Sequence, residues 1–191
     1  MVVCVAGPIA AGKNFYCSKL QEQGFFCLDA DAEIHKIIQE KQNEILSQFE
    51  EAAASAGVSL CAADGSLDRR ALGRLLFKRP ELLERQERIV YPEFEARVQK
   101  LIDDQKAVAD QNGGLVINAA LLYKTPKILR QCQKIIYIDA PLIVRAIRIR
   151  RRDKLSFLQI ARRIKSQRGL YEQYKKFAAD YGIEFVKTRS E

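Results

Sequence analysis

Short apolar runs, separated by longer amphipathic segments, divide this sequence of 191 residues. Five of the runs have the length and apolar content that are typical of buried parallel strands. They span residues 2–6, 25–28, 115–118, 134–139 and 183–186. Because the segments between them have helical spacing, the pattern predicts an α/β protein whose parallel sheet of about five strands is covered by helices on both faces.

A long helical stretch separates the second predicted strand from the third. The pattern predicts helices over residues 43–55, 68–77, 81–90 and 92 to about 109. Pro80 and Pro92 each introduce a helix, because proline suits the first helical turn. A turn is expected at Asp64-Gly65-Ser66. We interpret residues 43–110 as a helical insertion over the sheet edge, within a single domain that spans residues 1–191.

Positive charge is concentrated late in the sequence. The formal net charge is +8, and residues 140–176 contain twelve lysines and arginines but two acids, so the remaining chain is close to neutral. One interpretation is a solvated basic face on amphipathic helices. The other is a mobile lid over residues 145–168, whose arginines grip phosphate oxygens. The segment has no recognised nucleic-acid motif, so we expect no nucleic-acid partner.

Residues 7–14 form a glycine-bounded loop directly after the first strand. They read Gly-Pro-Ile-Ala-Ala-Gly-Lys-Asn, which has the spacing and the strand-to-helix position of a phosphate-binding P-loop. Gly7 and Gly12 allow the backbone to curl around phosphate, and Lys13 supplies a cation beside the helix N-terminus. Asn14 stands where the pattern has the Ser or Thr that binds magnesium. An ordinary glycine turn is the alternative explanation.

Two acids follow the second predicted strand. Asp29 and Asp31 lie at the expected carboxyl end of that strand, where open α/β sheets bind their ligands. Asp31 is placed there to accept a proton from an attacking hydroxyl. The alternative is that Asp29 or Ala30 merely caps the next helix. His35 is the single histidine, which excludes a histidine metal cluster and a Ser-His-Asp triad.

The remaining composition predicts a cytoplasmic protein. The sequence is 48% hydrophobic, but no apolar run approaches the roughly 18 residues of a membrane span, so we expect no membrane partner. The initial methionine leads directly into a strand rather than into a signal peptide. The five cysteines include no Cys-x-x-Cys pair, and reduced, partly buried thiols explain them better than disulfides or zinc ligands.

Together these features resemble the dephospho-coenzyme A kinase family of P-loop kinases, which are of the nucleoside-monophosphate-kinase type. The resemblance covers most of the chain, and its most telling parts are Asp29-Ala30-Asp31 and the spacing of Arg152-Asp153 to Gln167. Its other residues are Gly7 to Lys13, His35, Asp64, Gly65, Leu67, Asp68, Arg69, Leu72, Gly73, Phe77, Pro92, Leu121-Leu122-Tyr123 and Ala179-Asp180-Tyr181.

The resemblance implies a three-layer P-loop kinase fold that uses ATP and Mg²⁺ to phosphorylate the ribose 3′-hydroxyl of dephospho-CoA. The products would be ADP and CoA, in the final step of coenzyme A biosynthesis, by a protein that is a monomer or a small homo-oligomer. Catalytic roles are implied for Lys13, Asp31 and Arg152, and an acceptor-binding role for residues 43–110. The implied ATP-binding residues are Gly7, Ala10, Ala11, Gly12, Lys13, Asn14 and Phe15. The implied substrate-binding residues are Asp29, Asp31, His35, Arg69 and Leu121.

Four positions depart from the family pattern. Asn14 replaces the magnesium-binding Ser or Thr, although its oxygen can still accept a bond from metal-bound water, and Tyr91 replaces a histidine. Asn118 and Lys124 replace acids near the metal or the acceptor. Two alternatives therefore stay open beside the dephospho-CoA kinase interpretation. One is a kinase for another small molecule or nucleotide, and the other is a nucleotide- or CoA-binding protein with weakened catalysis.

Overall fold

A computed structural model describes residues 1–77, 79–107 and 113–189 of the chain. Within them the chain divides into two compact units. The first is made of residues 1–31 and 98–191, and the second of residues 32–97. The helical unit overlaps the predicted insertion of residues 43–110, whose last three residues lie outside the described ranges together with the predicted helix end near residue 109.

Across the described residues, the first unit contains a parallel sheet with the strand order β2-β3-β1-β4-β5. The strands are β1 (Val2–Ala6), β2 (Phe26–Asp29), β3 (Leu115–Asn118), β4 (Lys134–Asp139) and β5 (Glu184–Arg189). β1 is central, since Cys4 pairs with Ile117 of β3 on one side and with Ile135 of β4 on the other. All three residues are fully buried. The predicted α/β class and parallel sheet are therefore confirmed.

The prediction of a buried second strand was wrong. β2 lies at the edge of the sheet and pairs with β3, and the side chain of Phe26 is 48% exposed. Because an edge strand has a neighbour on one side alone, less of its surface is covered than in a central strand. The apolar run located the strand but did not show its place in the sheet.

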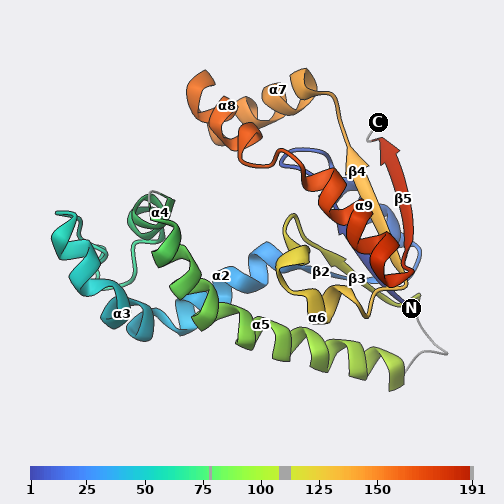
Figure 1. The fold of residues 1–191 in the computed structure, drawn as a ribbon, viewed down its shortest axis with the longest axis horizontal. Coiled ribbons are helices and arrows are strands. Elements are labelled where there is room, and N and C mark those ends of the chain that lie inside the picture. The colour runs from blue at the N-terminus through green and yellow to red at the C-terminus, as the bar shows by residue number, and fades with distance from the viewer. Residues whose placement is uncertain (78, 108–112, 190–191) are drawn as a thin grey trace. The chain divides into compact units, whose positions relative to one another are not determined.

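Helices cover both faces of this sheet. On one face, α1 (Lys13–Glu22) places Cys17 in a buried cluster with Val3, Val5, Val116, Ile136 and Ile138. On the other face, the ring of Tyr137 contacts Tyr171 and Tyr174 of α9 (Leu170–Tyr181), with centroids 5.2 and 6.3 Å apart. Figure 1 shows α9 lying across β4 and β5. The three layers follow from this alternation of apolar side chains along the strands.

The rest of the first unit connects these layers. It contains the short 3₁₀-helix η1 (Leu122–Lys124), α6 (Pro126–Leu129), α7 (Leu142–Asp153) and α8 (Phe157–Lys165). Lys154, which follows the last residue of α7, caps the helix in a left-handed conformation. α8 begins with a capping box, in which Ser156 and Gln159 exchange hydrogen bonds between their side chains and backbone N–H groups.

The second unit is helical, as predicted. Its helices are α2 (Ala30–Glu40), α3 (Gln42–Ser55), α4 (Arg69–Phe77) and the first part of α5 (Pro80–Ala107). Asp68 caps α4, because its carboxylate accepts bonds from the N–H groups of Arg70 and Ala71 at 2.8 and 3.0 Å. The predicted turn is present as well, since Asp64 accepts a bond from the Ser66 N–H and Gly65 has a positive φ.

One helix replaces the two that were predicted to begin at Pro80 and Pro92. Pro92 lies inside α5, although an internal proline removes a backbone hydrogen bond and costs about 3 kcal/mol. Four residues spaced four apart, Val90, Phe94, Val98 and Ile102, are each at most 2% exposed. Burial of this continuous stripe, at roughly 1.5–3 kcal/mol a side chain, outweighs the cost of the proline.

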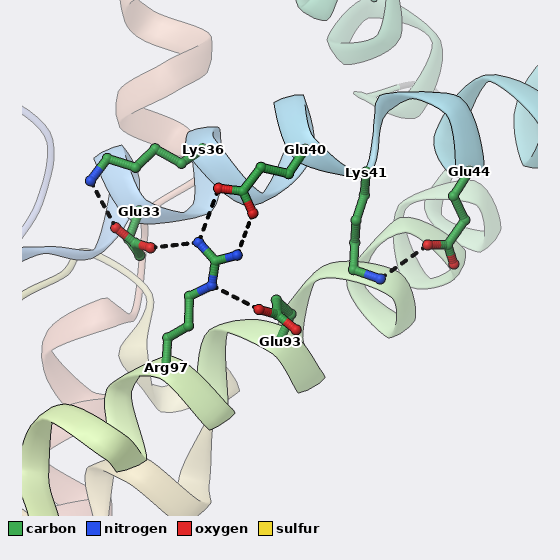
Figure 2. Close-up of polar contacts among 7 residues, drawn as sticks. All are labelled: Glu33, Lys36, Glu40, Lys41, Glu44, Glu93 and Arg97. Atoms are coloured by element: carbon green, nitrogen blue, oxygen red, sulfur yellow. Dashed lines mark hydrogen bonds and ion pairs between the residues drawn. The ribbon is translucent and has the colours of Figure 1, made fainter.

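Arg97 holds two helices of the second unit together (Figure 2). Its guanidinium donates to Glu33 of α2 at 3.0 Å and to Glu93 of α5 at 2.8 Å, and it also pairs with Glu40 of α2. The side chain of Glu33 is 13% exposed. The hydrogen bond from Arg97 is the main reason that the pKa of Glu33 is held below its usual value.

Replacement of Arg97 by methionine should destabilise the helical unit by on the order of 1–2 kcal/mol, because neighbouring carboxylates lose their shared partner. Urea unfolding followed by circular dichroism measures this. Arg88→Met is the matched control, since Arg88 on the same helix pairs with Glu84 across 3.8 Å at the surface. That control should cost less than about 0.5 kcal/mol. Equal losses in the two variants would contradict the role assigned to Arg97.

The wild type and Arg97→Met should also differ in how their stability changes at acidic pH. The pKa of Glu33 is lower in the folded protein than its ordinary value of 4.5, so the unfolded chain binds more protons there. The stabilisation from charged Glu33 is complete above the pKa that Glu33 has in the unfolded chain. It is lost as the pH falls through the lower pKa that Glu33 has in the folded protein. Wild-type stability should therefore drop more steeply than that of Arg97→Met below about pH 4.5.

Two further observations concern the whole described chain. Each of the five cysteines is a free thiol, and Cys4, Cys17 and Cys132 are buried, which agrees with the predicted reduced thiols. Among the helices of the described residues, none combines the length and the apolar content that a bilayer span requires.

Candidate active site

A cavity of about 770 Å³ lies where the P-loop and the carboxyl ends of β2 and β3 meet. This is the edge at which a parallel sheet is expected to bind ligands, and the volume is in the range of small-molecule sites. The cavity is lined by Ile9, Ala10, Ala11, Gly12, Lys13, Asn14, Phe15, Asp29, Asp31, Asn118, Ala120, Arg148, Arg152 and Gln167. All of these residues belong to the first unit.

The loop between β1 and α1 has the backbone of a phosphate-binding turn. Gly7, Ala10 and Gly12 have positive φ angles of 147°, 59° and 98°, so the chain curls sharply before α1 begins at Lys13. Gly12, which precedes the helix, has no side chain to cap it. The first N–H groups of α1 therefore remain available for an anion.

Gly7 cannot carry a side chain in this loop. A Cβ atom there would lie 2.2 Å from the carbonyl oxygen of Ile138, which is strand backbone. We therefore expect Gly7→Ala to destabilise the protein by roughly 3 kcal/mol, measured as a lower thermal midpoint. Gly73→Ala is the control, because a Cβ atom on Gly73 meets no atom within 4 Å and alanine favours a helix. A Gly7→Ala protein as stable as the wild type would contradict this geometry.

Lys13 lies in a mostly buried position at the start of α1. Its ammonium donates to the carbonyl oxygens of Gly7 at 3.0 Å and Pro8 at 3.4 Å. Burial lowers the pKa of Lys13, and the negative charges of Asp31 and Asp29 act in the opposite direction. The cation and both predicted acids therefore interact electrostatically around one cavity.

Three side chains that are distant in sequence bond to the backbone of Ile9 and Ala10 in the P-loop. The guanidinium of Arg145 in α7 donates to the carbonyl of Ile9 at 2.9 Å, and Gln167 accepts a bond from the Ile9 N–H at 2.7 Å. Arg148 donates to the carbonyl of Ala10 at 3.3 Å. The peptide groups on both sides of Ile9 are thus fixed by side chains rather than by the loop itself.

Asp153 links the end of α7 to α8. This carboxylate receives two bonds from Arg152, at 2.7 and 3.1 Å, and a third from Arg163 of α8 at 2.9 Å. The bond from Arg152 is the main reason that the pKa of Asp153 is lowered. Arg152 itself lines the cavity, so the ionised Asp153 orients one basic residue of the predicted lid beside the P-loop.

Most of the predicted site residues come together at the cavity. Gly7 lies just outside its lining, at the start of the loop, and Leu121 lies beside η1 with its side chain 41% exposed. His35 on α2 and Arg69 at the start of α4 belong to the helical unit. Their predicted contact with an acceptor remains a prediction.

Sequence reasoning missed the part played by Arg145. It lies in the basic segment that suggests a solvated face or a phosphate clamp, yet it is 6% exposed and bonds to backbone. Of the two interpretations of the basic segment, a solvated face does not describe Arg145, because this side chain is buried against the P-loop. The same burial lowers the pKa of its guanidinium. Gln167, which is among the residues that carry the family resemblance, also bonds to Ile9. It was therefore a usable signal that this part of the chain contacts the P-loop.

Comparison with known proteins supports a specific family. A sequence model of the dephospho-CoA kinase family matches residues 1–186. The dephospho-CoA kinase of Treponema pallidum is 37% identical over 174 residues, covering 90% of this chain and 80% of that relative. The dephospho-CoA kinase of Treponema denticola is 34% identical over 181 residues, covering 94% of this chain and 79% of that relative.

Solved structures share the fold. The structure of TT1252 from Thermus thermophilus matches with a TM-score of 0.76 at 24% identity, covering 100% of this chain and 90% of that one. Dephospho-CoA kinase from Campylobacter jejuni matches with a TM-score of 0.61 at 23% identity, covering 100% and 89%. These matches support the P-loop kinase fold that the resemblance implied. With the family match over nearly its whole length and a relative at 37% identity, the chain belongs to the dephospho-CoA kinase family.

Proposed function

We propose that this protein transfers the γ-phosphoryl group of ATP to the ribose 3′-hydroxyl of dephospho-CoA, giving CoA and ADP. Membership of the dephospho-CoA kinase family supports the reaction. The observation that carries the proposal is the cavity in which the P-loop, Lys13, Asp31 and Arg152 meet. It offers a phosphate cradle, a proton acceptor and a lid arginine in one place, which are the parts that phosphoryl transfer needs.

The P-loop is proposed to bind the phosphates of ATP. Curled backbone at Gly7 and Gly12 and the first N–H groups of α1 supply donors to phosphate oxygens. Lys13 replaces its bonds to the loop carbonyls with bonds to the outer phosphates, and Arg152 adds a second cation from α7. Charge on the transferring group is then neutralised by groups that are already in place.

Asp31 is proposed to orient the acceptor hydroxyl and to accept its proton as the oxygen attacks phosphorus. The carboxylate lines the cavity beside Lys13, and Asp29 lies two residues before it at the end of β2. The bond between the γ-phosphorus and the bridging oxygen breaks, and the electron pair leaves with ADP.

The residues present fit a magnesium ion. Mg²⁺ prefers a few carboxylate oxygens together with phosphates and water, and Asp29 and Asp31 offer such oxygens beside the P-loop. No cluster of three or more acidic, histidine or cysteine side chains able to hold a metal occurs in the described part of the chain, which agrees with an ion held largely by the nucleotide. When bound, the ion neutralises phosphate charge.

His35, Arg69 and Leu121 are proposed to contribute to acceptor binding. Arg69 begins α4 directly after the Asp68 cap, so its backbone is fixed by the helix N-terminus. The cytoplasmic location, the lack of a nucleic-acid partner and the monomeric or small homo-oligomeric state stay predictions from the sequence.

A coupled assay tests the function directly. Purified protein with ATP, magnesium and dephospho-CoA should release ADP and form CoA, with no comparable turnover when adenosine, AMP or shikimate replaces dephospho-CoA. Mass spectrometry of the product should place the new phosphate on the ribose 3′-oxygen. Folded protein that binds both substrates without turnover would identify a catalytically weakened binding protein instead. Turnover of a different acceptor alone would assign another kinase activity.

A further inference from the structure

Two amide side chains meet at the cavity. The side-chain nitrogen of Asn118 donates a hydrogen bond to the side-chain oxygen of Asn14, across 2.9 Å. Asn118 is 6% exposed and ends β3, which pairs with β1 and β2. Asn14 lies in the first turn of α1, directly after Lys13. Both residues line the cavity, so the sheet fixes one partner and the P-loop helix carries the other.

This bond decides which atoms Asn14 turns toward a ligand. A side-chain amide has an acceptor oxygen on one side and an NH₂ group with two donors on the other. Because the oxygen of Asn14 is directed at Asn118, its NH₂ group is directed away from Asn118. A phosphate oxygen is a charged acceptor, and N–H groups are the donors that it binds best.

The same bond makes Asn14 a poor direct ligand for a metal. Mg²⁺ binds oxygen at about 2.0–2.1 Å and demands regular geometry. An ion at that distance from the Asn14 oxygen would lie beside the amide hydrogens of Asn118, which carry partial positive charge. Relief of that repulsion would require the buried amide of Asn118 to give up its hydrogen bond, which is costly for a buried polar group.

We propose that Asn118 is a positioning residue, which holds the amide of Asn14 as a hydrogen-bond donor to a nucleotide phosphate oxygen rather than as a metal ligand. The proposal rests on the proposed function, since it requires a nucleotide in the cavity. Its consequence is that the P-loop holds nucleotide phosphates with a cation at Lys13 and a neutral donor at Asn14. Asn14 therefore supplies phosphate affinity that does not depend on a divalent ion.

Calorimetric titration with a non-hydrolysable ATP analogue, in EDTA and in magnesium, tests this without any turnover. The ratio of the wild-type affinities in the two buffers is the reference value for the variants. In Asn14→Ser the NH₂ donor is lost and a hydroxyl oxygen is gained. Its affinity in EDTA should fall about tenfold, as expected for a lost hydrogen bond to a charged group, while its affinity in magnesium is largely kept.

Asn118→Asp tests the same hydrogen bond by changing its donor, Asn118. A carboxylate accepts hydrogen bonds only, so it draws the NH₂ group of Asn14 toward itself and turns the oxygen to the cavity. Its ratio of magnesium to EDTA affinities should rise about tenfold. Circular dichroism checks that Asn118→Asp folds, because position 118 is buried. If Asn118→Asp does not fold, the test rests on Asn14→Ser, which lies at a less buried position.

Three results would overturn the inference. The first is a folded Asn118→Asp protein with the wild-type ratio of affinities. The second is an Asn14→Ser protein with the wild-type ratio of affinities. Both leave the proposed function intact, because nucleotide still binds. The third is a folded wild-type protein that binds no nucleotide in either buffer, which overturns the proposed function and this inference with it.

Discussion

Lys13→Met is expected to reduce kcat by at least about a thousandfold, the scale of losing a preorganised charge in a phosphoryl-transfer site. The ammonium of Lys13 donates to the carbonyl of Gly7 and interacts electrostatically with Asp31 and Asp29. Methionine keeps the length and the apolar stem but provides no charge for the outer phosphates. The measurement is steady-state formation of ADP with saturating ATP, magnesium and dephospho-CoA.

The control for Lys13→Met is Lys176→Met, because Lys176 is an exposed lysine on α9 of the same unit. Its kcat should equal that of the wild type. Thermal midpoints of both variants should stay near the wild-type value, since neither side chain fills the core. A folded Lys13→Met protein that retains a tenth of the wild-type kcat would remove Lys13 from the proposed phosphate site.

Asp31→Asn is expected to lower kcat by about a hundredfold to ten-thousandfold, the usual contribution of a positioned general base. Asparagine has nearly the same shape but does not accept a proton from the acceptor hydroxyl. The KM for ATP should change far less, because the P-loop contacts remain. Initial rates at varied ATP and dephospho-CoA, together with a binding titration, separate the two effects.

Asp180→Asn is the matched control for Asp31→Asn, since Asp180 is exposed on α9. A variant at position 31 that loses affinity for ATP but keeps its kcat would assign Asp31 to nucleotide binding instead. Loss of kcat together with unchanged binding is the outcome that a proton acceptor requires.

Several elements were predictable because local sequence and tertiary environment agree. β3 and β4 have the predicted bounds of residues 115–118 and 134–139, since both are continuous apolar runs that the sheet buries. The P-loop was predictable because its glycines satisfy a local backbone requirement at φ angles that favour glycine. The family membership was predictable because short motifs kept their order along most of the chain.

Other features depend on contacts that no local pattern contains. Pro92 predicted the start of a new helix, but burial of the stripe from Val90 to Ile102 stabilises one continuous α5 that includes the proline. Phe26 lies in an apolar run whose exposure follows from the strand order. Arg145 belongs to a basic segment by sequence and to the P-loop by contact. In each case the deciding neighbour is distant in the chain.

The side-chain bonds that hold the backbone of Ile9 and Ala10 also have a consequence for the synthesis of the protein. Residues 9 and 10 leave the ribosome well before the side chains that hold them, which are at positions 145, 148 and 167. At roughly 5–20 residues per second, synthesis of that interval takes several seconds or more. During this time the nascent loop has its glycines and its lysine but none of its clamping bonds. The loop is thus translated before the side chains that complete its structure.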